Sequence, residues 1–138
     1  MIDINSWTGE YIKAVNACFG SRVAFIGLQG SYARNEATEH SDIDMVLILD
    51  RVDAEDLRAY RNAVARLPHR ELLCGFVSGR QELRNWSEPD VFQLAFDTIP
   101  LQGSMEGIIP QLTAENARQA ARLGACNLYH GCVHNYLH

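Results

Sequence analysis

The order of apolar patterns along the chain predicts an α+β fold in which helices cover a mixed β-sheet. Helical periodicities and short strand-like runs follow each other as helix, strand, turn, strand, helix, strand, helix, strand, helix. The first two strand-like runs are separated by a polar stretch, which indicates a hairpin-like connection and some antiparallel pairing. The length of 138 residues suits one domain and is short for two.

The first half of the chain carries one helix and two strands. Apolar residues recur every three or four positions from Asp3 to Phe19, and Gly20 is a stop signal for that helix. Val23–Leu28 is a short apolar run rich in strand formers. Ile43–Leu49 is apolar at nearly every position, which is typical of a central strand.

The second half is expected to contain three helices and two strands. They are a helix over 53–67, a strand over 72–77, a short helix over 78–86 capped by Ser78, a strand over 91–96 and a helix from its cap Thr113 to His138. No stop signal closes the last helix, so we expect that it frays or that the natural chain continued. We therefore divide the chain into a core over 1–112 and a C-terminal helix over 113–138, the start of a helical region.

Composition and charge exclude several classes of protein. The net charge of −5 argues against general nucleic-acid binding, which depends on phosphate neutralisation by Lys and Arg. The four cysteines form no CxxC pair and lie in apolar patterns, so we expect buried, reduced thiols in a cytoplasmic protein: Cys18, Cys74, Cys126 and Cys132. Neither a signal peptide nor an apolar run of about 20 residues, the length that crosses a bilayer, is evident.

A glycine and a serine follow the first predicted strand directly. Gly30 allows a sharp turn and the close approach of a ligand. Ser31 is expected to cap a short helix that begins at Tyr32, and such a turn suits an anion such as a triphosphate. A Gly-Ser pair after a strand is also typical of an ordinary turn, so this feature is weak evidence alone.

Two aspartates lie at the start of the second strand, in the run Ser41-Asp42-Ile43-Asp44. Because residues two apart on a strand share a face, Asp42 and Asp44 project together while Ile43 enters the core. Adjacent carboxylates repel each other unless a cation is shared between them. Oxygen ligands of this kind suit Mg²⁺, which commonly binds one or two carboxylates together with substrate phosphates.

The whole segment from Gly30 to Asp44, GSYARNEATEHSDID, resembles the signature of the polymerase-β-like nucleotidyltransferase superfamily, in particular its small bacterial branch with the aminoglycoside nucleotidyltransferases. The resemblance implies a nucleotidyltransferase fold with nucleotide-binding residues and metal ligands at the positions that match. The resemblance implies nucleotide binding at Gly30 and Ser31 and metal binding by Asp42 and Asp44. Arg34 and Ser41 are further candidate nucleotide-binding residues, with a solvent-facing side chain as the alternative for Arg34. Family members usually have glycine where this chain has Asn35, and asparagine also tolerates a positive φ.

Active members of this superfamily carry a third carboxylate on a neighbouring strand. The best match is Asp97, at the end of the predicted strand over 91–96, in the segment FDTIPLQGS. Asp97 would complete a catalytic and metal-binding set with Asp42 and Asp44. The alternatives are that Asp97 is only a cap or turn residue before Ile99-Pro100, or that Asp90 supplies the carboxylate.

The resemblance implies a transferase that moves a nucleoside monophosphate from a nucleoside triphosphate, expected to be ATP, to an acceptor hydroxyl on an antibiotic-like small molecule or a protein. Two Mg²⁺ ions are the expected cofactors. The alternative is a non-catalytic module of the same fold, either antitoxin-like or nucleotide-sensing, that uses the C-terminal helix to contact a helical partner or a second copy. The histidines His130, His134 and His138 share one face of that helix and indicate an exposed or interface stripe rather than a metal site.

Overall fold

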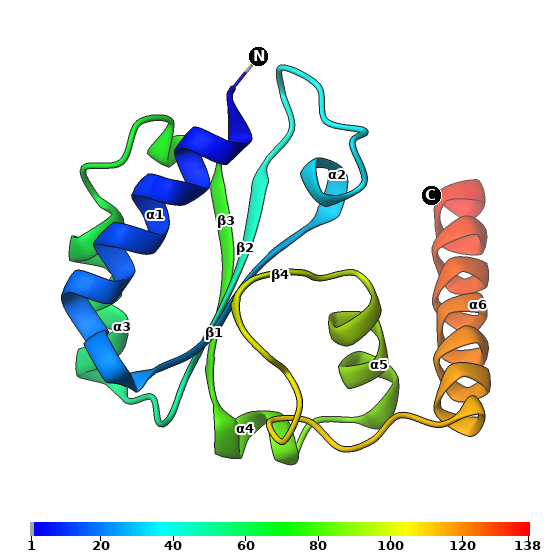
Figure 1. Ribbon diagram of the computed structural model, residues 1–138. Coiled ribbons are helices and arrows are strands. Elements are labelled where there is room, and N and C mark those ends of the chain that lie inside the picture. Colours follow the sequence, from blue (N-terminus) through cyan, green and yellow to red (C-terminus); the bar gives the residue numbers. More distant parts are fainter. Residues whose placement is uncertain (1) are drawn as a thin grey trace.

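The computed structural model describes residues 2–138, and a four-stranded mixed sheet with helices on both faces is its centre (Figure 1). The strands are β1 Val23–Gln29, β2 Ile43–Leu49, β3 Leu73–Gly79 and β4 Ile99–Gly103, in the order β3-β2-β1-β4. β1 runs antiparallel to β2 and β4, and β2 runs parallel to β3. The predicted α+β fold and the hairpin-like connection between the first two strands are confirmed.

Helices α1 (Ile4–Phe19) and α3 (Ala54–Val64) cover one face of the sheet (Figure 1). The predicted α1 is confirmed, because the Asp3 carboxylate accepts hydrogen bonds from the amides of Asn5 and Ser6 and caps the helix. Asp53 and Asp56 form a reciprocal capping box at the start of α3. The core on this face consists of Trp7, Tyr11, Val15, Phe19, Ile26, Leu28, Tyr32, Ile43, Met45, Leu47, Leu49 and Val64. Two short 3₁₀ turns, Gly20–Arg22 and Arg70–Leu72, lead into β1 and β3.

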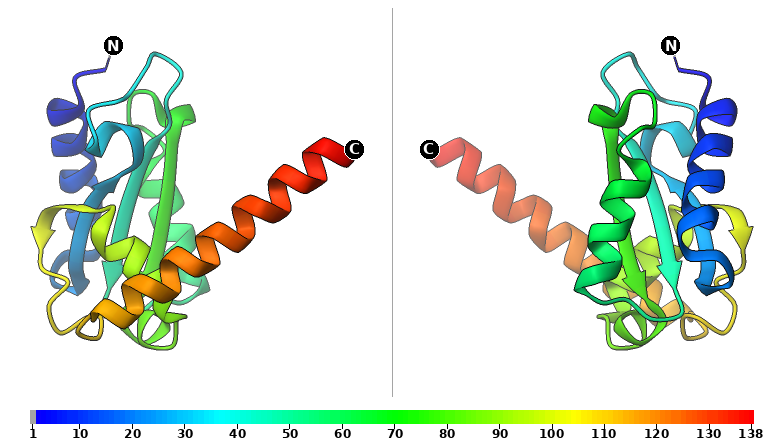
Figure 2. Two further views of the ribbon diagram at one scale, coloured as in Figure 1. Left: turned by 90° about the vertical axis from the view of Figure 1, so that its right-hand side faces the viewer. Right: turned by 90° about the vertical axis from the view of Figure 1, so that its left-hand side faces the viewer.

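The other face carries helix α5 (Glu88–Phe96), while the short helices α2 (Gly30–Ala33) and α4 (Arg80–Arg84) lie at opposite ends of the sheet (Figure 1). Its buried cluster is half the size: Phe25, Val46, Ile48, Leu83, Leu94 and Ile108. The long helix α6 (Ala114–Leu137) packs against α5 near its start and then extends away from the sheet (Figure 2). No helix among residues 2–138 has the length and apolar character needed to cross a membrane.

The strand predicted over 91–96 is wrong, because this segment is the second half of α5. Val91 and Leu94 are buried and lie three residues apart, which is a helical spacing, and a proline stands in the first turn. The fourth strand follows as β4. It contains Pro100, which an edge strand tolerates because it pairs on one side only.

The prediction of buried thiols is also wrong, since all four cysteines are free and exposed: Cys18, Cys74, Cys126 and Cys132. Cys126 and Cys132 lie on the extended part of α6, where every residue from 121 to 130 is exposed. The cap Thr113 is confirmed, and its hydroxyl accepts a hydrogen bond from the amide of Asn116. The apolar pattern of α6 therefore predicts the helix correctly, but most of this helix has no buried face.

Two predicted caps also differ from the structure. Helix α2 begins at Gly30 with Gln29 as its N-cap, so Ser31 lies inside the helix and does not cap it. Helix α4 has Gly79 as its N-cap rather than Ser78, because β3 continues to Gly79.

Candidate active site

The alternation of side chains along β2 separates the acidic residues from the larger core. Ile43, Met45, Leu47 and Leu49 belong to the core beneath α1 and α3, whereas Val46 and Ile48 belong to the cluster beneath α5. With a period of two, Asp44 shares the face of Val46 and Ile48. Asp44 is half-buried and Asp42, which immediately precedes the strand, is exposed. The start of β2 therefore presents carboxylates on the α5 face.

Gly30 approaches the Asp44 carboxylate closely. Gln29, the last residue of β1, pairs with Asp44 of β2, so the turn after β1 lies beside the acid. The φ of Gly30 is 68°, in the left-handed region, and a Cβ at this position would overlap Asp44 Oδ2. Only glycine satisfies both conditions, so the predicted proximity of the Gly30-Ser31 turn and Asp44 agrees with the geometry.

Negative charge gathers around Asp44. Burial is the main cause that raises the pKa of Asp44, and the charges of Asp42 and Asp97 raise it further. The charge of Arg34 acts in the opposite direction. The three predicted acids are thus near enough to influence one another, although they come from two distant parts of the chain.

Asp97 lies at the C-cap of α5, just before β4, and not at the end of a strand as predicted. Its Oδ1 accepts a hydrogen bond of 2.7 Å from Arg34 Nη1. Arg34 Nε also donates to Glu36 Oε2 at 3.0 Å, so this guanidinium bridges two carboxylates. Next to Asp97, the buried Thr98 hydroxyl accepts a 2.8 Å hydrogen bond from Gln29 Nε2, which joins this segment to the end of β1.

The loop between α2 and β2 is closed by its own polar groups. Ser41 Oγ accepts a 2.8 Å hydrogen bond from the Thr38 amide, so in this structure Ser41 stabilises the loop. Asn35 has a φ of 58°, and the expectation that asparagine replaces glycine in a left-handed turn is confirmed. The Ser31 carbonyl accepts a 2.8 Å hydrogen bond from the Glu36 amide.

Cys74 is a neighbour of the acids that sequence reasoning missed. It stands opposite Asp44 in the parallel β2–β3 register, so the two side chains are neighbours on one face of the sheet. No sequence motif indicates this proximity, because it follows from the pairing of two strands that a helix separates. Within residues 2–138, no three His, Cys, Asp or Glu side chains are gathered closely enough to bind a metal ion by themselves.

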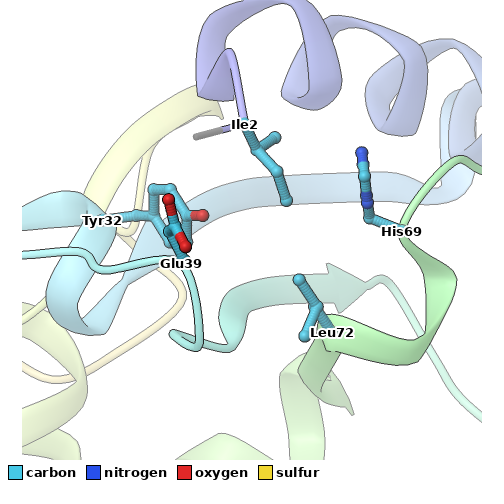
Figure 3. Close-up of a pocket in the computed structure, with 5 residues that line it drawn as sticks. All are labelled: Ile2, Tyr32, Glu39, His69 and Leu72. Atoms are coloured by element: carbon cyan, nitrogen blue, oxygen red, sulfur yellow. The ribbon is translucent and has the colours of Figure 1, made fainter.

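A pocket of about 260 Å³ lies near the start of α1 (Figure 3). It is lined by Ile2, Tyr32, Glu39, His69 and Leu72. Tyr32 and Leu72 belong to the core beneath α1 and α3, so this pocket opens on the face of the sheet opposite to Asp44. None of the predicted site residues lines it.

The sequence profile of the nucleotidyltransferase domain family matches residues 10–92, which include the Gly30 turn, Asp42 and Asp44. The chain belongs to the nucleotidyltransferase domain family. The enzyme class predicted from the sequence is thereby confirmed at the level of the family. Comparison with curated protein sequences gives no significant match.

Solved structures of other proteins share the fold. A spectinomycin adenyltransferase from Enterococcus faecialis, solved with ATP and spectinomycin, aligns with a TM-score of 0.58 and 11% identity over 84% of this chain and 63% of that one. A toxin–antitoxin structure with AMP-PNP gives 0.51 and 16% identity over 94% and 93%. A tri-AMPylated HEPN toxin of Shewanella oneidensis in complex with its MNT antitoxin gives 0.50 and 17% identity over 97% and 98%. The identities are low, so these similarities establish the fold.

Proposed function

We propose that this nucleotidyltransferase moves a nucleoside monophosphate from ATP to an acceptor hydroxyl, with its reaction centre at Asp42, Asp44 and Asp97. The observation that carries the proposal is the close approach of Gly30 to the Asp44 carboxylate. In this arrangement, a triphosphate seated on the Gly30-Ser31 turn would have its phosphates next to the two acids of β2. The acceptor oxygen would then attack the α-phosphorus, with pyrophosphate as the leaving group.

The residues present suit Mg²⁺. Asp42 and Asp44 offer carboxylate oxygens, the donors that Mg²⁺ prefers. Burial, with the charges of Asp42 and Asp97, raises the pKa of Asp44, and a bound cation would offset this cost of the charged form. Mg²⁺ usually completes its shell with water and substrate phosphates, so two protein carboxylates suffice for binding. When bound, the ion would neutralise negative charge on the phosphates and on these acids. Arg34, half-exposed and paired with Asp97, is proposed to contact a phosphate once the nucleotide binds.

Asp97 is proposed as the group that accepts the proton of the acceptor hydroxyl. Its carboxylate is held by Arg34 in this structure, and about a third of its side chain is exposed. A groove of about 530 Å³ begins at Arg34 and Asp97 and runs between α5 and α6. Its walls are formed mainly by Phe92, Phe96, Ala117, Ala120 and Ala121, so an acceptor with an apolar or aromatic portion suits it.

Both classes of acceptor predicted from the sequence are kept in this proposal. The adenyltransferase relative was solved with spectinomycin, and the toxin–antitoxin relative contains an AMPylated protein. A screen of labelled ATP against aminocyclitol antibiotics and against helical proteins separates the two classes. If label is transferred to neither class, the remaining function is nucleotide binding without turnover.

The alternative is a binding module of the same fold that has lost catalysis. Two observations favour it: Arg34 occupies the Asp97 carboxylate, and α6 exposes large apolar residues such as Leu128, Tyr129 and Tyr136 that suit a helical partner or a second copy. The two functions differ in whether Asp97 is required for turnover. Asp97→Asn should abolish transfer of label by an enzyme, whereas a binding module shows no transfer before or after the substitution.

Calorimetry with Mg²⁺ and ATP tests the proposed nucleotide site. Asp42→Asn combined with Asp44→Asn is expected to remove Mg²⁺-dependent ATP binding. The double variant should remain folded and no less stable, because a carboxyl with a raised pKa opposes folding in its charged form. Exchange of the exposed Glu10, which lies on α1 and so on the opposite face of the sheet, for Gln is the control and should bind as the parent does. Equal binding by the double variant would remove the metal-site assignment.

A further inference from the structure

Gln29 connects the two parts of the chain that carry the proposed acids. It is the last residue of β1, the strand that lies between β2 and β4, and its register partner on β2 is Asp44. Residues paired in this way point to the same face of the sheet. On the β4 side, Gln29 Nε2 donates a 2.8 Å hydrogen bond to Thr98 Oγ1, and Thr98 directly follows Asp97. Gln29 therefore joins the strand position beside Asp44 to the segment that bears Asp97.

Thr98 is held against β1 by more than this one bond. Its hydroxyl also donates to the Leu94 carbonyl of α5, and the whole residue is buried. A Cβ at Gly27 would overlap the Thr98 methyl and the Phe25 ring. The φ of Gly27 is not positive, so the close approach of these side chains is the reason for a glycine inside this strand. The end of α5 is thus seated on β1 through Thr98.

The Asp97 side chain itself has weaker support. Its carboxylate pairs with Arg34, whose side chain is half-exposed, and such pairs fix a position poorly. Its backbone amide donates to the Gln93 carbonyl at 2.9 Å, so its main chain follows the end of α5. Burial alone does not require the bond from Gln29, because the Thr98 hydroxyl already has a partner within α5.

We propose that Gln29 and Thr98 are positioning residues for Asp97: their hydrogen bond holds the end of α5 on β1 and so sets the Asp97 carboxylate relative to Asp44. This inference rests on the proposed function, because it assumes that Asp97 acts in the transfer. Neither residue needs to contact the reacting atoms, since both act through Asp97. Their loss should slow the transfer without weakening the binding of ATP at Asp42 and Asp44.

The test removes the hydrogen bond from either end. Gln29→Met keeps the length of the side chain without a donor, and Thr98→Val keeps its shape without a hydroxyl. Transfer from ATP labelled at the α-phosphate should show a kcat roughly 10- to 100-fold lower in each variant, the loss expected when a reacting group is displaced. Calorimetry should show Mg²⁺-dependent ATP binding within about two-fold of the parent. The double variant should be no slower than Thr98→Val alone, and Thr98→Ser should recover most of the rate.

Gln102→Met is the matched control. Gln102 of β4 exchanges two amide hydrogen bonds, of 2.8 and 3.1 Å, with Asn16 of α1 on the opposite face of the sheet. Its replacement should leave kcat unchanged, and thermal unfolding verifies that each variant is folded.

The possible results separate this inference from the proposed function. A parental kcat in Gln29→Met and Thr98→Val, or an equal loss in Gln102→Met, would overturn the inference and leave the proposed function standing. ATP binding that weakens as much as kcat falls would also overturn it. If the unsubstituted protein does not bind ATP, or transfers label to no acceptor in the screen, both fail.

Discussion

The two faces of the sheet differ in how completely they are covered. The α1/α3 face buries a cluster of twelve residues, including four from β2, beneath two well-capped helices. The α5 face buries six and leaves Asp44 half-exposed beside a glycine turn and a groove. One strand, β2, serves both faces, because successive side chains point in opposite directions. The difference teaches that stability is concentrated on one side of β2 and the proposed chemistry on the other.

The largest expected effect on stability comes from the covered face. Leu47→Ala removes a fully buried side chain from β2 and should cost about 2–5 kcal/mol of unfolding free energy. Asp44→Asn, on the opposite face of the same strand, should cost nothing. Chemical denaturation of the two variants measures the contrast, and a similar loss in both would contradict the division between the faces.

The next largest effect concerns the ion pairs on the two faces, which should differ in their contribution to stability. Arg22 donates two hydrogen bonds to Asp56, at 2.8 and 2.6 Å, and the Asp56 side chain is only 11% exposed. Asp56→Asn is therefore expected to cost about 1.5–3 kcal/mol, whereas Asp97→Asn, which loses the more exposed Arg34 pair, should cost less than about 1 kcal/mol. Denaturation at neutral pH checks both values, and equal losses would contradict the comparison.

The Arg22 pair also predicts a pH dependence. The hydrogen bonds from Arg22 lower the pKa of Asp56 below its ordinary value. The stabilisation is therefore fully present above the ordinary carboxyl pKa and is lost as pH falls through the lowered pKa of the folded protein. Acid titration of the unfolding free energy should show a smaller decline for Asp56→Asn than for the parent. If the unfolding free energy falls equally with pH in the variant and the parent, Asp56 does not cause the decline.

The smallest pair of effects concerns two glycines. Gly30→Ala should destabilise the protein by about 1–3 kcal/mol, because its φ is 68° and the added Cβ meets Asp44, and it should also weaken ATP binding. Gly9 lies in α1 with open space around it, and Gly9→Ala should stabilise by about 0.5–1 kcal/mol. Thermal unfolding and calorimetry of both variants measure these changes. A gain in stability for Gly30→Ala would contradict the geometry at Asp44.

The sequence allowed prediction of the elements whose signals are local. The cap at Thr113, the strand Ile43–Leu49 and the positive φ of Asn35 follow from neighbouring residues, and the structure agrees with each. The segment Val91–Phe96 was predicted wrongly, because six apolar-rich residues suit either a strand or a helix. The burial of Val91 and Leu94, which lie three residues apart, fits the helix.

Contacts between distant segments were the part that sequence could not supply. The ion pair of Arg34 with Asp97 and the pairing of Cys74 with Asp44 depend on strand order and register. The exposure of Cys126 on α6 depends on what covers that helix, and the apolar pattern contains no such information. The roles of Asp42, Asp44 and Asp97 remain the proposals that the experiments above address.

The mixed direction of the strands has a consequence for the loop over residues 34–42. β2 starts where antiparallel β1 ends and where parallel β3 begins, so backbone pairing fixes both ends of this loop. Residues added at its exposed tip, near Glu39, would lengthen the excursion into solvent without displacing either anchored end. This connection is therefore the segment in which a reporter group or a specificity-altering insertion is best tolerated.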